Sequence, residues 1–147
     1  MLKFEFQQMI ARPVEDVFEY SSDPQHILSS EPTAVVEGTP GELRAGSTFK
    51  VRFDDGRKHA TVDIIEHDPP NYFEFEARID KPLPYLIRGN YTCAESEGGT
   101  EMHADVSIHD VPAVMEALFK EKIRGFLREN FESMRSALEA RTECIRA

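Results

Sequence analysis

Residues 10–24, IARPVEDVFEYSSDP, mark the point where one apolar pattern ends and another begins. Before them, residues 2–10 (LKFEFQQMI) alternate between an apolar and a polar face, which is typical of a half-buried strand. Pro13 ends that strand, because proline lacks an N–H donor but fits the first turn of a helix. The apolar residues within 14–18 then recur at helical spacing, and SSDP offers N-caps for a second short helix over about 24–29. The sequence therefore predicts a strand followed by two short helices.

From about residue 33 to residue 108 the pattern is almost entirely that of strands. Runs of alternating apolar and polar residues are separated by clusters of Gly, Pro and Asp, at the spacing of an antiparallel meander. In one such run Phe49, Val51 and Phe53 alternate with basic residues. One face of the predicted sheet is thus apolar and the other is polar.

The last part of the chain predicts one long helix. After Asp110, a candidate N-cap, the apolar period becomes helical and continues to about Ala140, with no proline beyond Pro112. At the usual rise per residue such a helix is about 40 Å long, whereas a domain of this size has a radius of gyration of about 15 Å. The helix must therefore cross the whole body of a single domain, which we place over residues 1–147.

The composition argues against several classes of function. The 27 acidic and 17 basic residues give a formal net charge of -10, which repels nucleic-acid phosphates and anionic membrane surfaces. No apolar run approaches the ~20 residues that span a bilayer, and no basic segment leads into an apolar run at the N-terminus. We therefore expect a cytoplasmic protein with no nucleic-acid partner and no membrane insertion, present as a monomer or a homodimer.

The sequence contains no metal or cofactor motif. Cys93 and Cys144 show neither metal-ligand spacing nor a disulfide framework, and we expect both to be free thiols. His59, His103 and His109 have outward parity in their strands, and no histidine is spaced with a second histidine or a carboxylate in a known metal motif. A glycine-rich phosphate loop and a nucleophile elbow are also absent. The expectation is no metal and no cofactor.

The predicted order of elements is that of a helix-grip fold, and five segments carry a resemblance to a known family. They are IARPVEDVF at 10–18, AGSTF at 45–49, IIEHDPP at 64–70, GGT at 98–100 and FLRENFESMRSALEAR at 126–141. In this order they resemble the polyketide cyclase/dehydrase and lipid-transport group of the START-like (SRPBCC) superfamily, over essentially the whole chain. Many members of that group have a tryptophan just after the second short helix, where this chain reads LSSEP and has no tryptophan anywhere.

The resemblance implies an α+β fold in which a curved antiparallel sheet of about seven strands wraps around the long helix, with two short helices after the first strand. In that fold a cavity lies between sheet and helix, and such pockets are mostly apolar with few polar groups. Residues with inward parity form the predicted ligand-binding set: Phe49, Val51, Phe53, Val62, Ile64, Phe73, Phe75, Tyr91, Met102, Met115, Phe119, Phe126 and Asn130. The alternative for each of them is that it simply fills a core.

Two members of this set are also weak catalytic candidates. Asn130 falls in the middle of the apolar stripe of the long helix, where its amide would orient a ligand carbonyl. Tyr91 has inward parity in its strand, where its hydroxyl would donate to a ligand oxygen. Their structural alternatives are an amide bonded to nearby backbone and an aromatic core residue with its hydroxyl at the rim.

Three functions are compatible with this sequence. The first is binding of a small hydrophobic or amphipathic molecule, such as a lipid or a polyketide, in the cavity. The second is an enzyme resembling polyketide cyclases and dehydratases, in which Tyr91 and Asn130 assist proton transfer. The third is a protein-interaction module, which would need a sizeable exposed apolar patch.

Overall fold

The structure is a computed structural model that describes residues 1–24, 26–27, 35–37, 43–53, 56–81 and 84–146, with the backbone alone at 35, 53, 81 and 141–146. Within these ranges it has seven strands and two helices. In chain order they are β1 (Leu2–Ile10), α1 (Val14–Ser22), β2 (Val35–Glu37), β3 (Thr48–Phe53), β4 (Lys58–Asp68), β5 (Tyr72–Lys81), β6 (Tyr85–Ser96), β7 (Gly99–His109) and α2 (Ala113–Arg146).

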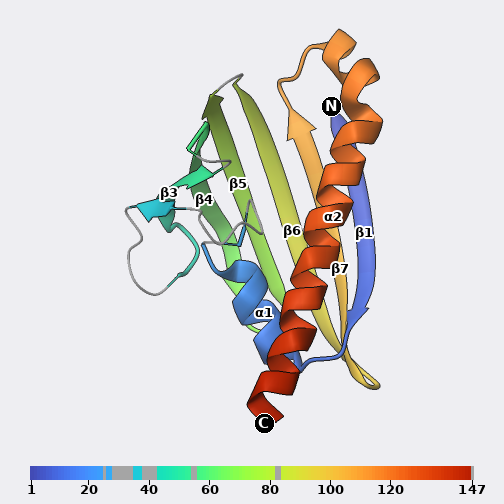
Figure 1. Ribbon diagram of the computed structural model, residues 1–147. Coiled ribbons are helices and arrows are strands. Elements are labelled where there is room, and N and C mark those ends of the chain that lie inside the picture. Colours follow the sequence, from blue (N-terminus) through green and yellow to red (C-terminus); the bar gives the residue numbers. More distant parts are fainter. Residues whose placement is uncertain (25, 28–34, 38–42, 54–55, 82–83, 147) are drawn as a thin grey trace.

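The strands form one antiparallel sheet in the order β1-β7-β6-β5-β4-β3-β2. From β2 to β7 each strand pairs with the next one in the chain, as predicted for a meander. The first strand pairs with the last, so that Leu2 lies opposite Ile108 and Ile10 opposite Thr100. The curved sheet lies behind α2 in Figure 1, with α1 beside the lower part of that helix. This architecture confirms the predicted helix-grip fold.

The chain turns from strand to helix where the sequence predicted it. Leu2, Phe4 and Ile10 are buried, while all odd-numbered residues of β1 are exposed. Pro13 precedes the first turn of α1, and its carbonyl accepts bonds from the amides of Asp16 and Val17. The two acidic residues of that first turn lie at the helix end that favours negative charge.

The predicted second short helix is not found in the described residues. Residues 24 and 26–27 form turns, and the rest of the predicted segment, 25 and 28–29, lies outside the described residues. Asp23 has an extended backbone (φ -64, ψ 129), which is the conformation expected of a residue that precedes a proline. The amide of His26 donates to the carbonyl of Asp23 at 2.8 Å, so the chain turns at Pro24 directly after α1.

The long helix begins two residues later than Asp110 predicts. The amides of Met115 and Glu116 bond to the carbonyl of Pro112, while Asp110 has a positive φ of 65 and belongs to the preceding turn. In Figure 1, α2 crosses one face of the sheet in front of β7 and close to β1. The Gln8 amide of β1 donates to the Phe131 carbonyl of α2 at 3.0 Å, which ties the two elements together. No helix in the described part of the chain is long and apolar enough to cross a membrane.

The two helices cover different parts of the inner face of the sheet. Phe18 of α1 packs edge-on against Phe73 of β5, with ring centroids 6.4 Å apart, over the large core of β3 to β5. At the other edge Ile123 and Leu127 of α2 pack against Leu2, Phe4 and Ile108 of β1 and β7. The space that remains between these two contact regions is where the candidate site lies.

Candidate ligand cavity

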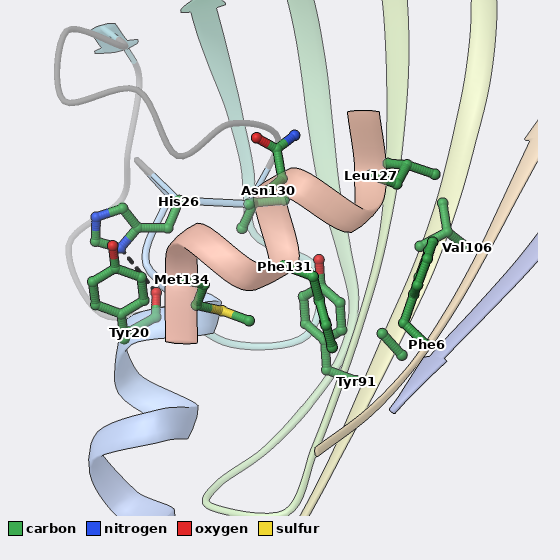
Figure 2. Close-up of a pocket in the computed structure, with 11 residues that line it drawn as sticks. Phe6, Tyr20, His26, Tyr91, Val106, Leu127, Asn130, Phe131 and Met134 are labelled. Atoms are coloured by element: carbon green, nitrogen blue, oxygen red, sulfur yellow. Dashed lines mark hydrogen bonds between the residues drawn. The ribbon is translucent and has the colours of Figure 1, made fainter. Parts of the chain in front are cut away.

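A cavity of about 70 Å³ lies between the C-terminal half of α2 and strands β1, β6 and β7. It opens to solvent on one side, and the end of α1 with residues 26–27 forms its side wall. Figure 2 shows most of the side chains around it. The lining residues are Phe6, Tyr20, His26, Ile27, Tyr91, Ala104, Val106, Leu127, Asn130, Phe131 and Met134.

The wall is largely aromatic. The Phe131 ring lies 5.7 Å from that of Phe6 and 6.5 Å from that of Tyr91, measured between centroids. At the side wall the rings of Tyr20 and His26 are stacked, with centroids 3.9 Å apart and an angle of 11° between the planes. Because stacked and tilted rings of this kind favour further aromatic contacts, the cavity suits a flat or apolar group.

Tyr91 contributes the clearest polar group of the wall. It stands on β6 with its hydroxyl toward α2 in Figure 2, and among the described residues that hydroxyl has no hydrogen-bond partner. Burial, with a smaller contribution from the nearby Cys93, raises the pKa of Tyr91 to about 12. The phenol therefore stays protonated throughout the physiological range and is available to donate a hydrogen bond to a ligand oxygen.

His26 lines the cavity, although the sequence pattern did not predict it as a site residue. Its Nδ1 lies 2.9 Å from the carbonyl oxygen of Tyr20, the contact that is dashed in Figure 2. A carbonyl can only accept, so Nδ1 carries the proton, and Nε2 of the neutral ring is left as an acceptor. His26 lies in a turn outside any periodic run, so strand parity and helical spacing could not place it.

Asn130 lines the same cavity but does not converge with Tyr91. In Figure 2 its amide points away from the Tyr91 hydroxyl, on the other side of the helix backbone from Phe131 and Met134. The two predicted polar groups therefore share one cavity without aiming at one point. A single ligand atom held between them would require the amide to turn.

Comparison with known proteins places this geometry in a family. A model of the family described as polyketide cyclase / dehydrase and lipid transport matches residues 1–139. The chain belongs to this family. A search of curated proteins finds none that matches it.

Several solved structures share the fold. DynU16, from the dynemicin biosynthetic locus, has a TM-score of 0.70 at 14% identity, over 93% of this chain and 47% of its own, so this chain spans about half of DynU16. A protein of Arthrobacter aurescens has a TM-score of 0.71 at 16% identity, covering 95% of this chain and 87% of that one. Ms6760 from Mycobacterium smegmatis has a TM-score of 0.65 at 22% identity, covering 95% and 89%. At these identities the likeness concerns the fold alone.

In this family member most of the predicted ligand-binding strand residues form the core instead of the cavity wall. They point inward, as their parity indicates, but all are at most 2% exposed and none lines the cavity: Phe49, Val51, Val62, Ile64, Phe73, Phe75 and Met102. The alternative stated for them, that they fill a core, is the arrangement found. Phe18 of α1 packs against Phe73, and Ile27 and Leu43 belong to the same cluster, so other side chains fill the inner face here. The side chain of Phe53 lies outside the described residues.

The predicted helix residues divide in the same way. Asn130 lines the cavity, Met115 is half-buried, and Phe119 and Phe126 are 37% and 50% exposed. The stripe extends along the whole helix, but α2 is close enough to the sheet to bury it fully only near Met134 and further along. The helix therefore turns its N-terminal aromatic residues toward solvent rather than into a pocket.

Six further wall residues were predicted to face inward but were not singled out as ligand-binding residues. Phe6, Ala104 and Val106 have inward parity in β1 and β7, and Leu127, Phe131 and Met134 belong to the helical stripe. Periodicity identifies the face that turns inward and gives no information about where that face lacks a packing partner. Only the relative placement of α1 and α2 determines that location.

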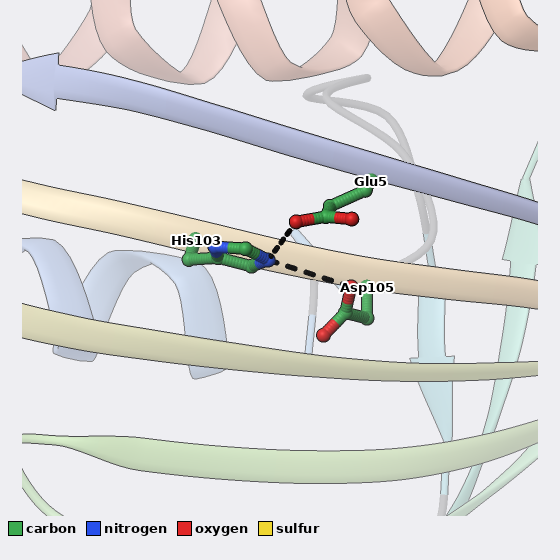
Figure 3. A group of neighbouring side chains, drawn as sticks. All are labelled: Glu5, His103 and Asp105. Carbon is green, nitrogen blue, oxygen red and sulfur yellow. Dashed lines mark ion pairs between the residues drawn. The ribbon is translucent and has the colours of Figure 1, made fainter.

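A second group of polar side chains lies on the opposite, outer face of the sheet (Figure 3). The β1–β7 register places Glu5 directly opposite Asp105, and Nε2 of His103 lies 3.0 Å from the first carboxylate and 3.4 Å from the second. These side chains are 36% to 69% exposed. We interpret the group as surface ion pairs that link β1 to β7 when the imidazole is protonated, separate from the cavity.

Proposed function

We propose that this chain binds a small hydrophobic or amphipathic molecule in the cavity between α2 and the sheet. The observation that carries the proposal is the Tyr91 hydroxyl, which lies on an aromatic wall with no hydrogen-bond partner among the described residues. A ligand that displaces water from this hydroxyl without replacing the hydrogen bond would lose about 1–3 kcal/mol. A ligand that offers an oxygen there avoids this loss and keeps the free energy of its apolar contacts.

The size of the cavity restricts how the ligand sits. Its volume of about 70 Å³ is smaller than the roughly 150 Å³ of an apolar cavity that accepts benzene. A ligand therefore inserts one end and leaves the rest at the open side, or it displaces flexible wall residues. Met134 is suited to such displacement because its side chain is unbranched.

Native mass spectrometry of gently purified protein, followed by organic extraction, tests the proposal. We expect a defined apolar adduct on the wild type and its loss in Val106→Phe, which fills the cavity from β7. Val114→Phe is the matched control, because it makes the same change at a site on α2 that is 65% exposed. An adduct that persists in Val106→Phe would show that the ligand binds elsewhere and would contradict the proposal.

Catalysis of the cyclase or dehydratase type is the second candidate function. The Tyr91 hydroxyl supports this catalytic function, because a fixed hydrogen-bond donor stabilises negative charge that develops on a carbonyl oxygen. Binding takes first place because Asn130, the other candidate, points away from that hydroxyl in Figure 2. With a confirmed substrate, unchanged turnover in the Tyr91→Phe/Asn130→Ala double variant would exclude this assignment.

We infer a cytoplasmic location and a small-molecule partner for the domain. Cys93 is a free thiol in the core, and burial raises its pKa to about 11, which leaves it protonated and unreactive. A free cysteine and an acidic surface favour a reducing compartment. Blocking of Cys93 only after unfolding, in cells treated with a thiol reagent, would support this location.

A further inference from the structure

The wall of the cavity carries no formal charge. Among its eleven lining residues, as far as the structure describes them, none is Lys, Arg, Asp or Glu. The undescribed positions 25, 28–34, 38–42, 54–55, 82–83 and 147 contain no Lys, Arg or His, and the basic residues described by backbone alone, Lys81, Arg141 and Arg146, stand at or near the C-terminal ends of β5 and α2. The neighbouring Lys58 places its Nζ 5.7 Å from the ring centroid of Phe126, a half-exposed residue that is not part of the wall.

An anionic group has no counter-charge in such a wall. Burying an unpaired carboxylate or phosphate costs several kcal/mol, and the net charge of -10 adds a general repulsion of anions. The one wall residue that can become positive is His26, whose ring stacks on Tyr20. An uncharged oxygen, in contrast, accepts a bond from the Tyr91 hydroxyl without any such cost.

The orientation of the ligand follows from the same wall. An apolar end inserted against Tyr91 would displace water from its hydroxyl without replacing the hydrogen bond, which is unfavourable. An end that carries a carbonyl or hydroxyl oxygen satisfies it. Phe6 and Phe131, 5.7 Å apart between centroids, then provide the contact for an attached ring.

Building on the proposed function, we propose that the ligand is an uncharged aromatic or conjugated molecule that inserts a carbonyl or hydroxyl oxygen toward Tyr91. Fatty acids and phosphate-bearing lipids are excluded as preferred ligands, because each would bring an anion to this uncharged wall. Neutral aromatic ketones and phenols are the class that fits. This is a narrower statement than apolar binding, since a fatty acid is equally apolar along its chain.

Two matched pairs of probes test the inference at pH 8: acetophenone against benzoate, and 2-acetylnaphthalene against 2-naphthoate. Within each pair the ring is the same and only the charge of the oxygen-bearing group differs. Dissociation constants come from the shifts of the Tyr91 and Phe131 amide signals in NMR titrations. We expect the ketone of each pair to bind at least about tenfold more tightly than the carboxylate. Tyr91→Phe should weaken ketone binding by about five- to tenfold.

The outcomes separate this inference from the proposed function. A carboxylate that binds in the cavity as tightly as its ketone would overturn the inference and leave cavity binding intact. If neither member of either pair shifted the cavity signals, both the inference and the proposed function would be rejected. His26→Gln removes the only wall group that can carry a positive charge, so the preference for ketones should persist in this variant; its disappearance would also count against the inference.

Discussion

At Gly89, in the middle of β6, the sheet has no room for a side chain. A Cβ at this position would lie 2.6 Å from Cε1 of Phe75, whose ring is only 2% exposed and therefore has little freedom to move. Gly125 on α2 is the opposite case, because nothing lies within 4 Å of its equivalent Cβ position. The two glycines thus differ in the space around them, although both lie inside a regular element.

Gly89→Ala should lower the free energy of unfolding by about 1–3 kcal/mol, because the added methyl group overpacks the core at Phe75. Gly125→Ala, the control, should raise it by up to about 1 kcal/mol, since alanine favours a helix interior. Urea denaturation of both variants gives the two values. Equal effects of the two substitutions would contradict the packing described for Phe75.

Tyr91 predicts how stability depends on alkaline pH. Its pKa is about 12 in the folded protein, against about 10 in an unfolded chain. Between these values the unfolded state releases the proton first, so stability falls as the pH rises. The contribution is complete below about pH 10 and is lost as the pH passes about 12, with a size of about 2 kcal/mol.

Comparison of the wild type with Tyr91→Phe isolates this contribution, because Tyr72 and Cys93, whose pKa values are also raised, are present in both proteins. The difference in unfolding free energy between them should shift against the wild type from pH 9 to pH 12. A difference that stays constant over this range would mean that the Tyr91 phenol is not desolvated.

At the scale of elements, α2 is most deeply buried toward its C-terminal end. Leu138 is fully buried and Met134 is 8% exposed, whereas Val114, Leu118 and Phe126 are 50% exposed or more. The C-terminal part of the apolar stripe belongs to the large core, while Ile123 and Leu127 are half-buried against the smaller core cluster at β1 and β7. This end of the helix also forms the roof of the cavity.

Leu138→Ala should cost about 2–5 kcal/mol of unfolding free energy, as expected for a large buried side chain. Phe126→Ala should cost less than about 1 kcal/mol, because half of its surface already faces water. Thermal denaturation followed by circular dichroism is sufficient to rank the two variants. A larger loss of stability in Phe126→Ala than in Leu138→Ala would contradict the deeper burial of the C-terminal part of α2.

Sequence patterns were sufficient to predict the strands and the long helix, and to predict which face of each one is buried. The alternation in β1 and the period of α2 are both found, because burial against a sheet imposes periods of two and 3.6 residues. Residues 25 and 28–29 of the predicted second short helix lie outside the described residues, and the described part is a turn in which the His26 amide donates to the Asp23 carbonyl.

The site was only partly predictable for a different reason. Tyr91 and Asn130 were assigned to the cavity by parity and spacing, and both line it. His26 was missed because it lies in a turn, and Phe73 and Phe75 were assigned to the wall although both are buried in the core. A cavity is a place where packing is absent, and its position depends on how two helices divide one sheet.

At the scale of the whole molecule, that division is the central structural feature. Phe18 of α1 packs against rings of β4 and β5, while Ile123 and Leu127 of α2 pack on the β1–β7 side, and the cavity lies between Tyr20 at the end of one helix and Met134 of the other. We therefore predict that a ligand changes the NMR signals of residues between these two helices and leaves those of the rest of the sheet unchanged.

The most direct test is a titration of protein labelled with ¹³C at the methionine methyl groups, with acetophenone as the probe. Met134 lines the cavity, Met102 is a fully buried core residue outside it, and Met9 is 40% exposed on the outer face. The account predicts a saturable shift of the Met134 methyl signal, with the signals of Met102 and Met9 nearly unchanged. Saturable shifts at Met9 without a response from Met134 would contradict a binding site between α2 and the sheet.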